Sequence, residues 1–485
     1  MSSVWKGPLE RIDEFRWRIP KGYKQGMRAD AIVVTDAEGL EVARDGEALE
    51  QLANSACLPG ISQPALAMPD IHSGYGFPIG GVGAMRLEDG VITPGGIGFD
   101  INCGVRLIRT NLELGDATPK IKPWIDRLYR DVPSGLGTKG PIQLSANEVR
   151  QVLEHGAQWA MRSGYGSPAD LECTEDGGKM EAADSSTVSS RALERGMPQL
   201  GTMGSGNHFV EIQVVEEVLA LDVAKVFELH ENQIVIMIHT GSRGLGHQVC
   251  TDYLATMNSA LKKYGMTVPD RQLACAPFQS PEGQRYYAAM ACAANFAWAN
   301  RQCITHWVRQ ATAREFGSSP ESLGMTLLYD VCHNIAKIEE HSVDGRSRKL
   351  CVHRKGATRA FPPGHSDVPA AYRRVGQPVI VPGDMGRNSY VLVGTQIAME
   401  ISFGSTCHGA GRLMSRNEAL SAQSPGDVRQ SLAEAGVYAR SASKRALAEE
   451  APEAYKDVND IVDITHKAGI SMKVVRLRPL GVVKG

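Results

Sequence analysis

Several sequence signatures are missing from this chain of 485 residues, and each absence disfavours a class of protein. No two of the ten cysteines form a C-x-x-C pair, so a zinc ribbon or finger is not expected. The chain has no G-x-x-x-x-G-K-[ST] phosphate loop, which disfavours P-loop nucleotide enzymes. It also lacks the K-x-D-G lysine motif of ATP-dependent nucleic-acid ligases. If nucleotide chemistry occurs here, another nucleophile must carry it.

Long apolar runs are missing as well. No stretch approaches the roughly 20 apolar residues of a membrane span. The opening residues, MSSVWKGPLERIDEFRW, carry charges throughout and lack the apolar core of a secretory signal. Scattered cysteines in such a chain favour reduced thiols over a disulfide framework. We therefore expect a cytoplasmic protein with no membrane segment.

The formal net charge of −2 gives no general attraction to nucleic acid, so an RNA partner would require a local basic patch. Three clusters qualify: Arg354, Lys355 and Arg359; Arg412 and Arg416; and Lys473, Arg476 and Arg478. Taken singly, each is better explained as a solvated charged surface.

Helical and strand patterns are mixed along the chain, and no linker clearly separates domains. The main predicted helix is capped by Ser280, starts at Pro281 and ends near Gly317. Further helices are expected over 144–162, 428–449 and 452–467. Residues 173–196 are mostly polar and small, which is typical of a loop-like insertion. The expected fold class is α+β, with a mixed β-sheet core and surrounding helices.

Three strands of buried type end at a chemically capable side chain. QIVIMIHTGSRG delivers His239 and then Arg243, MTLLYDVCHN delivers His333 and Asn334, and PVIVPGDMG delivers Asp384. A rigid sheet can hold such side chains on one rim. This arrangement suits a site assembled from distant parts of the sequence.

Five residues could bind metal ions. Asp100 and Cys103 stand three residues apart in GGIGFDINCGVRL, and His208, His239 and His333 each follow an apolar strand or a glycine-rich turn. For any one histidine, a packed core residue is the better explanation; for the set, metal binding is. Two metals could be held if the thiolate bridges them. Cysteine and histidine favour zinc, whereas the carboxylate and a phosphate substrate favour Mn²⁺, so the metal stays open.

Eight motifs carry a family resemblance: MPDIHSG, GGIGFDINCGVR, GSGNHFVE, HTGSRGLG, HRKGATRAF, PGDMG, STCHGAGR and GVVKG, in this order from about residue 60 to the last residue. Together they resemble the RtcB family of GTP-dependent RNA ligases. The resemblance implies one RtcB-like catalytic domain over residues 1–485. It also implies an enzyme that joins RNA 3′-phosphate or 2′,3′-cyclic phosphate ends to 5′-hydroxyl ends, in tRNA splicing or RNA repair. The implied route passes through a histidine–GMP intermediate and a GMP-activated RNA 3′ end.

The resemblance also implies a role for each candidate. His408 of STCHGAGR would attack the α-phosphate of GTP, and Asp70 of MPDIHSG would hold its ring. A neutral imidazole is a competent nucleophile, and its phosphoramidate can pass GMP onward. Two Mn²⁺ ions would share one thiolate: Cys103 with Asp100 and His208, and Cys103 with His239 and His333.

Nucleotide and RNA contacts follow from the same resemblance. Glu211 has a chemical rationale, because a carboxylate accepts the paired N–H donors of a guanine edge. RNA phosphates would contact Arg243, Arg412 and Arg416. The implied partners are RNA with these ends, GTP and, by analogy only, an archaease-type activator. The implied GTP or GMP contacts are Asn207, His208, Phe209, Val210, Glu211, His333, Asn334, Pro382, Gly383, Asp384, Met385, Ser389, His408, Gly409, Ala410, Gly411 and Lys484.

Two other functions remain open at this point. A dinuclear metal-dependent phosphodiesterase would use the same metal cluster to activate water, but would need neither GTP nor a His408 adduct. A non-catalytic RNA- or nucleotide-binding protein with a structural metal would have no turnover to lose when His408 is replaced.

Overall fold

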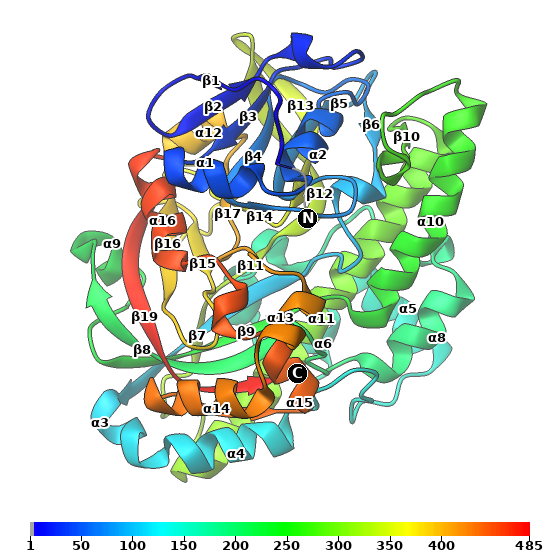
Figure 1. Ribbon diagram of the computed structural model, residues 1–485. Helices are drawn as coiled ribbons and strands as arrows, with labels where there is room; N and C mark the ends of the chain where they lie inside the picture. Colours follow the sequence, from blue (N-terminus) through cyan, green and yellow to red (C-terminus); the bar gives the residue numbers. More distant parts are fainter. Residues whose placement is uncertain (1–3) are drawn as a thin grey trace.

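Two large β-sheets form the core of the molecule, and the computed structural model describes residues 4–485. The first sheet forms the upper part of Figure 1. Its strand order is β1 (Glu10–Arg11), β2 (Arg16–Ile19), β3 (Ala31–Val34), β4 (Ala65–His72), β5 (Ile79–Arg86), β13 (Arg346–Lys355) and β12 (Asn334–Val343). Only β3 and β4 pair in parallel in this sheet, within residues 4–485.

The second sheet has eight strands, of which β18 (Tyr438–Ser441) pairs in parallel with β19 (Ser471–Lys484). The others follow the order β11 (Thr326–Cys332), β7 (Gly104–Glu113), β9 (Gln233–Thr240), β8 (Phe209–Val218), β19, β16 (Ser389–Gly394) and β15 (Pro378–Val381). Two small pairs are β6 (Val91–Ile92) with β10 (Ala276–Pro277), and β14 (Ala357–Arg359) with β17 (Ser405–Cys407). Mixed sheets surrounded by helices confirm the predicted α+β fold class.

The longest helix, α11 (Pro281–Phe316), matches its sequence signals closely. The Ser280 hydroxyl accepts the Gly283 N–H at 3.1 Å, and Gly317 ends the helix in the left-handed region at φ 64°. The alanine-rich middle of α11 is buried, and it packs against α10 (Arg243–Lys263), α4 (Ile121–Asp131), α5 (Ala146–His155) and α6 (Ala157–Arg162). Figure 1 shows α10 and α11 running together beside the sheets.

The other helix predictions are confirmed in part. The segment 144–162 forms α5 and α6, which are separated by Gly156. The predicted helix over 428–449 is wrong in its middle: α14 (Pro425–Glu434) ends before Gly436, and strand β18 precedes α15 (Lys444–Glu449). Here backbone pairing with the C-terminal strand outweighs local helix propensity. The segment 452–467 starts as a short 3-10 turn and becomes helical in α16 (Val458–Lys467).

Residues 173–196 contain two 3-10 turns and the helix α8 (Ser190–Gly196). Glu175 in this segment is buried, pairs with Lys337, and accepts the backbone N–H of Cys332 at 3.0 Å. The segment 173–196 therefore contributes at least one polar side chain, that of Glu175, to the buried interior of the fold. The remaining helices are α1 (Ala37–Arg44), α2 (Ala48–Ser55), α3 (Leu114–Ala117), α7 (Pro168–Glu172), α9 (Leu221–Val226), α12 (Gln396–Ile401) and α13 (Arg416–Ala422).

A buried arginine in α11 ties this helix to the second sheet. The Arg301 guanidinium binds both carboxylate oxygens of Asp330 in β11, at 2.8 and 2.9 Å. It also donates to the carbonyl oxygens of Asn102 at 2.8 Å and of Thr240 at 3.0 Å. Arg106 of β7 shares Asp330 at 2.7 Å, so one carboxylate compensates two buried cations.

Among residues 4–485, no helix is both long and apolar enough to cross a membrane.

Candidate active site

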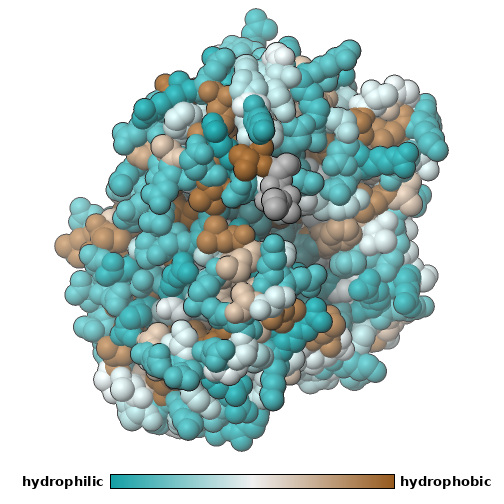
Figure 2. All heavy atoms as spheres, viewed as in Figure 1, coloured by the Kyte–Doolittle hydropathy of each residue, from teal (hydrophilic) through white to brown (hydrophobic). Residues whose placement is uncertain are grey.

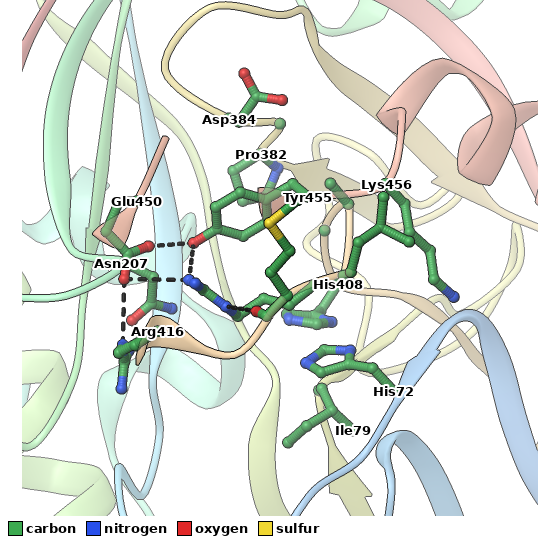
Figure 3. A pocket seen from close by; sticks show the side chains of 18 of the residues that line it. His72, Ile79, Asn207, Pro382, Asp384, His408, Arg416, Glu450, Tyr455 and Lys456 are labelled. Atoms are coloured by element: carbon green, nitrogen blue, oxygen red, sulfur yellow. Dashed lines mark hydrogen bonds and ion pairs between the residues drawn. The ribbon is translucent and has the colours of Figure 1, made fainter. Parts of the chain in front are cut away.

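A cavity of about 840 Å³ gathers residues from distant parts of the chain. It appears as a hollow near the centre of the face drawn in Figure 2, and Figure 3 shows part of its lining. The two sheets join at this cavity, because His333 is the single residue between β11 of the second sheet and β12 of the first. All the predicted site residues line it except Asp70, His208, Val210, Ser389 and Arg243.

Strand register explains how the metal-binding candidates meet. In the second sheet Cys332 pairs with Gly104, and Gly104 pairs with Thr240. The next residues along, His333 and Cys103, are therefore neighbours, and the His333 N–H donates to the Cys103 carbonyl at 2.9 Å. His239 pairs with Phe209, which brings it close to His208 at the start of β8. The ends of these neighbouring strands thus bring Cys103 and the three histidines together, and Asp100 stands three residues before Cys103.

The donor atoms form two groups that share one sulfur. Within each group, Asp100, Cys103 and His208 in one and Cys103, His239 and His333 in the other, the ligand atoms lie within 4.8 Å of one another. The Cys103 Sγ lies 3.5 Å from Nε2 of His208 and 3.2 Å from Nε2 of His239. The structure therefore brings together all five residues that the sequence suggested as metal ligands.

The chemistry of the first group fits a bound cation. Nδ1 of His208 lies 3.0 Å from the Met203 carbonyl, a contact that requires the ring hydrogen on Nδ1. Nε2 of the same ring lies 2.8 Å from the Asp100 carboxylate. Two atoms that each present a lone pair at this distance need a proton or a metal ion between them.

The second group also fits a metal. Burial lowers the pKa of His239 and His333 well below the usual histidine range, so both rings are neutral near pH 7. Neutral imidazole is the form that binds metal ions. Burial and the Asp100 carboxylate raise the pKa of the Cys103 thiol, and a bound divalent ion would reverse this by stabilising the thiolate.

His408 follows β17 and is held by a buried carboxylate from the first sheet. Its Nδ1 lies 2.5 Å from Asp70 Oδ2, and the same oxygen accepts the backbone N–H of His408 at 2.9 Å. The Asp70 side chain has no exposed surface, whereas His408 retains 16% exposure at the cavity. Because Nδ1 is occupied, Nε2 is the ring nitrogen left for chemistry. The His408 ring lies 4.9 Å from that of His333, between centroids.

Most of the predicted nucleotide residues line the same cavity as His408. Glu211 is buried, and burial raises its pKa to about 8. Burial also raises the pKa of Asp384 to about 6. Lys484 is ordered as the last residue of β19, pairs with Phe209 in β8 and lies 5.3 Å from the centre of that ring. Phe209, the first residue of β8, and Lys484, the last residue of β19, thus both line the cavity.

The predicted residues outside the lining have distinct places. Asp70 and His208 lie directly behind lining residues that they contact. The Ser389 hydroxyl accepts the N–H of Gly383 at 3.1 Å, which fixes the 382–385 loop. Val210 is packed in the hydrophobic core. Arg243 is partly buried next to Thr202, where the Asp100 carboxylate partly offsets the lowering of its pKa by burial.

In two of the three basic clusters named from the sequence, cationic side chains are paired with acidic side chains of the protein. The expectation of solvated charge is wrong for Arg354 and Arg359, which are buried and paired with Glu339 and Asp176. The C-terminal cations each have an acidic partner: Lys473 pairs with Asp463, and Arg476 and Arg478 pair with Glu216. Of the three clusters, only Arg412 and Arg416 line the cavity.

The cavity is also lined by residues that the sequence analysis did not single out, among them His72, Glu450, Tyr455 and Lys456 (Figure 3). The Lys456 ammonium donates to the carbonyls of Pro69 and Ile71, on both sides of Asp70. His72 belongs to the MPDIHSG motif, which was a usable signal. The other three stand in a stretch without any motif.

Comparison with known proteins shows the family to which the chain belongs. The family model described as tRNA-splicing ligase RtcB matches residues 51–485. The chain belongs to the RtcB family. Similar RtcB proteins, each named tRNA-splicing ligase RtcB, come from Thermococcus kodakarensis (56% identical over 99% of both chains) and Archaeoglobus fulgidus (54% identical over 99% of both chains). A third, from Methanococcus maripaludis, is 52% identical over 99% of this chain and 100% of its own.

The shared sulfur gives a prediction about metal binding. In equilibrium dialysis against Mn²⁺, we expect the wild-type RtcB chain to bind two ions and Cys103→Ala to lose both, because both donor groups need Sγ. His208→Ala should lose one ion. Cys173→Ala is the matched control, because Cys173 lies beside Tyr372 and belongs to neither group. Two ions retained by Cys103→Ala would contradict the shared thiolate.

Proposed function

We propose that the protein is a cytoplasmic RNA ligase, dependent on GTP and Mn²⁺, that joins 3′-phosphate or 2′,3′-cyclic phosphate ends to 5′-hydroxyl ends in tRNA splicing or RNA repair. Relatives named tRNA-splicing ligases support the RNA-joining activity. One observation carries the proposal: His408, held by Asp70, lies in the same cavity as the Cys103 donor groups. A histidine nucleophile needs such an orienting carboxylate and a free Nε2.

In the first step, Nε2 of His408 attacks the α-phosphorus of GTP. A P–N bond forms, the bond to the bridging oxygen breaks, and pyrophosphate leaves. The proton on Nδ1 stays hydrogen-bonded to Asp70, whose charge stabilises the positive charge that develops on the ring. The small residues Gly409, Ala410 and Gly411 leave room for a phosphate to approach.

In the second step, an oxygen of the RNA 3′-phosphate attacks the GMP phosphorus, and the P–N bond to His408 breaks. The RNA now ends in a phosphoanhydride to GMP. In the third step, the 5′-hydroxyl attacks the RNA phosphorus, loses its proton and displaces GMP. Activation is required because a phosphate monoester has a poor leaving group, and a 2′,3′-cyclic phosphate must first be opened by water.

The metal ions would be held by the two donor groups: Asp100, Cys103 and His208 for one ion, and Cys103, His239 and His333 for the other. Bound divalent ions would neutralise phosphate charge as the leaving group departs. A carboxylate ligand and phosphate substrates favour Mn²⁺ over the softer preference of zinc.

The guanine nucleotide would be recognised by Glu211, with Asn207, Asn334, Ser389, Lys484 and the loop 382–385 around it. A guanine edge offers two N–H donors to a carboxylate, which adenine cannot do. Arg416 would contact an RNA phosphate, and family analogy suggests an archaease-type activator as a partner.

Both rival functions fit these contacts less well. A metal-dependent phosphodiesterase needs the donor groups but gives no role to the His408–Asp70 pair. A non-catalytic binding protein would not need a nucleophile positioned 4.9 Å, between ring centroids, from a metal-binding candidate.

The direct test is an RNA-joining assay. Purified protein with Mn²⁺ should join an RNA ending in a 3′-phosphate to one starting with a 5′-hydroxyl when GTP is present, and not when ATP replaces it. His408→Ala should abolish joining, whereas His306→Ala, which lies outside the cavity lining, should retain it. Cyclic-phosphate hydrolysis without GTP and without joining would favour the phosphodiesterase instead.

A pH dependence follows from Glu211. Guanine donors favour its ionised form, so below about pH 8 GTP binding must release a proton. We expect the Kd for GTP to fall as pH rises from 6 to 8, by at most about tenfold per pH unit, and then to level off. Glu211→Gln should bind more weakly and lose this slope. Other titrating groups are present in both the wild type and Glu211→Gln. Equal slopes of Kd against pH in the two proteins would therefore contradict the assignment of the pH dependence to Glu211.

A further inference from the structure

Glu450 is an unexpected residue in a cavity that would bind two polyanions. It follows α15, lines the cavity and is 1% exposed. Three residues from the same wall contact its carboxylate: Arg416 through Nε at 3.2 Å, Arg412 through a terminal amino group at 3.3 Å, and the Tyr455 hydroxyl. Figure 3 shows the carboxylate between Tyr455 and Arg416. A buried carboxylate must be compensated, and here two arginines compensate it.

The two arginines are used differently. Arg412 donates from Nε to the Met414 carbonyl at 3.0 Å and from its terminal amino groups to the Glu449 carbonyl at 2.8 Å and the Tyr455 hydroxyl at 3.1 Å. Its side chain is only 17% exposed. Because every guanidinium nitrogen of Arg412 already donates to a protein acceptor, this residue is a structural part of the cavity wall.

Arg416 keeps its donors for a ligand. Its side chain is 53% exposed, and within residues 4–485 only its Nε donates to a protein acceptor, Glu450. One terminal amino group lies against the turn before Asn207, because a Cβ built on Gly206 would be 2.9 Å from it. This places the free edge of the guanidinium beside the segment that carries Asn207 and His208.

We propose that Glu450 is a positioning residue that locks Arg412 into the cavity wall and directs the free amino groups of Arg416 to a backbone phosphate of RNA. This inference rests on the proposed function and adds the residue that prepares its RNA contact. A half-exposed arginine otherwise samples many rotamers, whereas a carboxylate on Nε fixes the plane of the fork. The two terminal amino groups then suit bidentate binding of a phosphate.

The test is equilibrium binding of a fluorescent RNA ending in a 3′-phosphate, measured by anisotropy over a salt series without GTP. Arg416→Met should weaken binding about tenfold and lower the salt slope by about 0.7, the loss of one phosphate contact. Glu450→Gln should weaken binding about threefold or more, because the Arg416 guanidinium is then no longer held in place for its phosphate contact. In the double variant, binding should be no weaker than in Arg416→Met alone, because Glu450 acts through Arg416.

Glu449→Gln is the matched control, since the Glu449 carboxylate faces Arg445 and not the cavity. It should bind RNA as wild type does. Glu450→Asp, which retains the charge at a shorter reach, replaces Glu450→Gln if that variant does not fold. Independent, multiplying effects of the Glu450 and Arg416 changes, or wild-type binding by the Glu450 variants, would overturn the inference. Coupled binding without any RNA joining would instead contradict the proposed ligase.

Discussion

The active site depends on one buried charge, the guanidinium of Arg301 in α11. A buried arginine costs several kcal/mol unless it is fully paired, and here Asp330, two backbone carbonyls and the Asn102 side-chain oxygen complete its hydrogen bonds. One carbonyl belongs to Asn102, directly before Cys103, and the other to Thr240, directly after His239. The helix therefore fixes the backbone beside two donor residues that are far apart in sequence.

The second constraint is the junction of the two sheets. Asp70 comes from β4 in the first sheet, whereas His239 comes from β9 in the second. His333, between β11 and β12, joins the sheets, and the centre of its ring lies 4.9 Å from that of His408 and 5.1 Å from that of His239. The proposed nucleophile and the residues that could hold metal ions thus share one cavity, which would suit a series of phosphoryl transfers without release of the intermediate.

Part of the fold and of the candidate site could be predicted from local sequence signals. The caps of α11 and the strands ending at His239 and His333 are encoded in adjacent residues, and each was found. The predictions that were wrong concern residues whose structure depends on pairing between distant segments of the chain. Strand β18 replaces a predicted helix because it pairs with β19, and Arg354 can be buried because the Glu339 carboxylate of the neighbouring strand β12 pairs with its guanidinium. Glu450 belongs to no motif, and only the fold brings its carboxylate to the cavity.

The most direct test of the central claim is the mass of the protein after incubation with Mn²⁺ and GTP. Peptide mapping at neutral or alkaline pH preserves a phosphoramidate. The account predicts a GMP-sized increment on His408 that requires metal and forms more slowly in Asp70→Asn. A protein that binds GTP and metal but carries no increment, or carries it on another residue, would contradict His408 as the nucleophile.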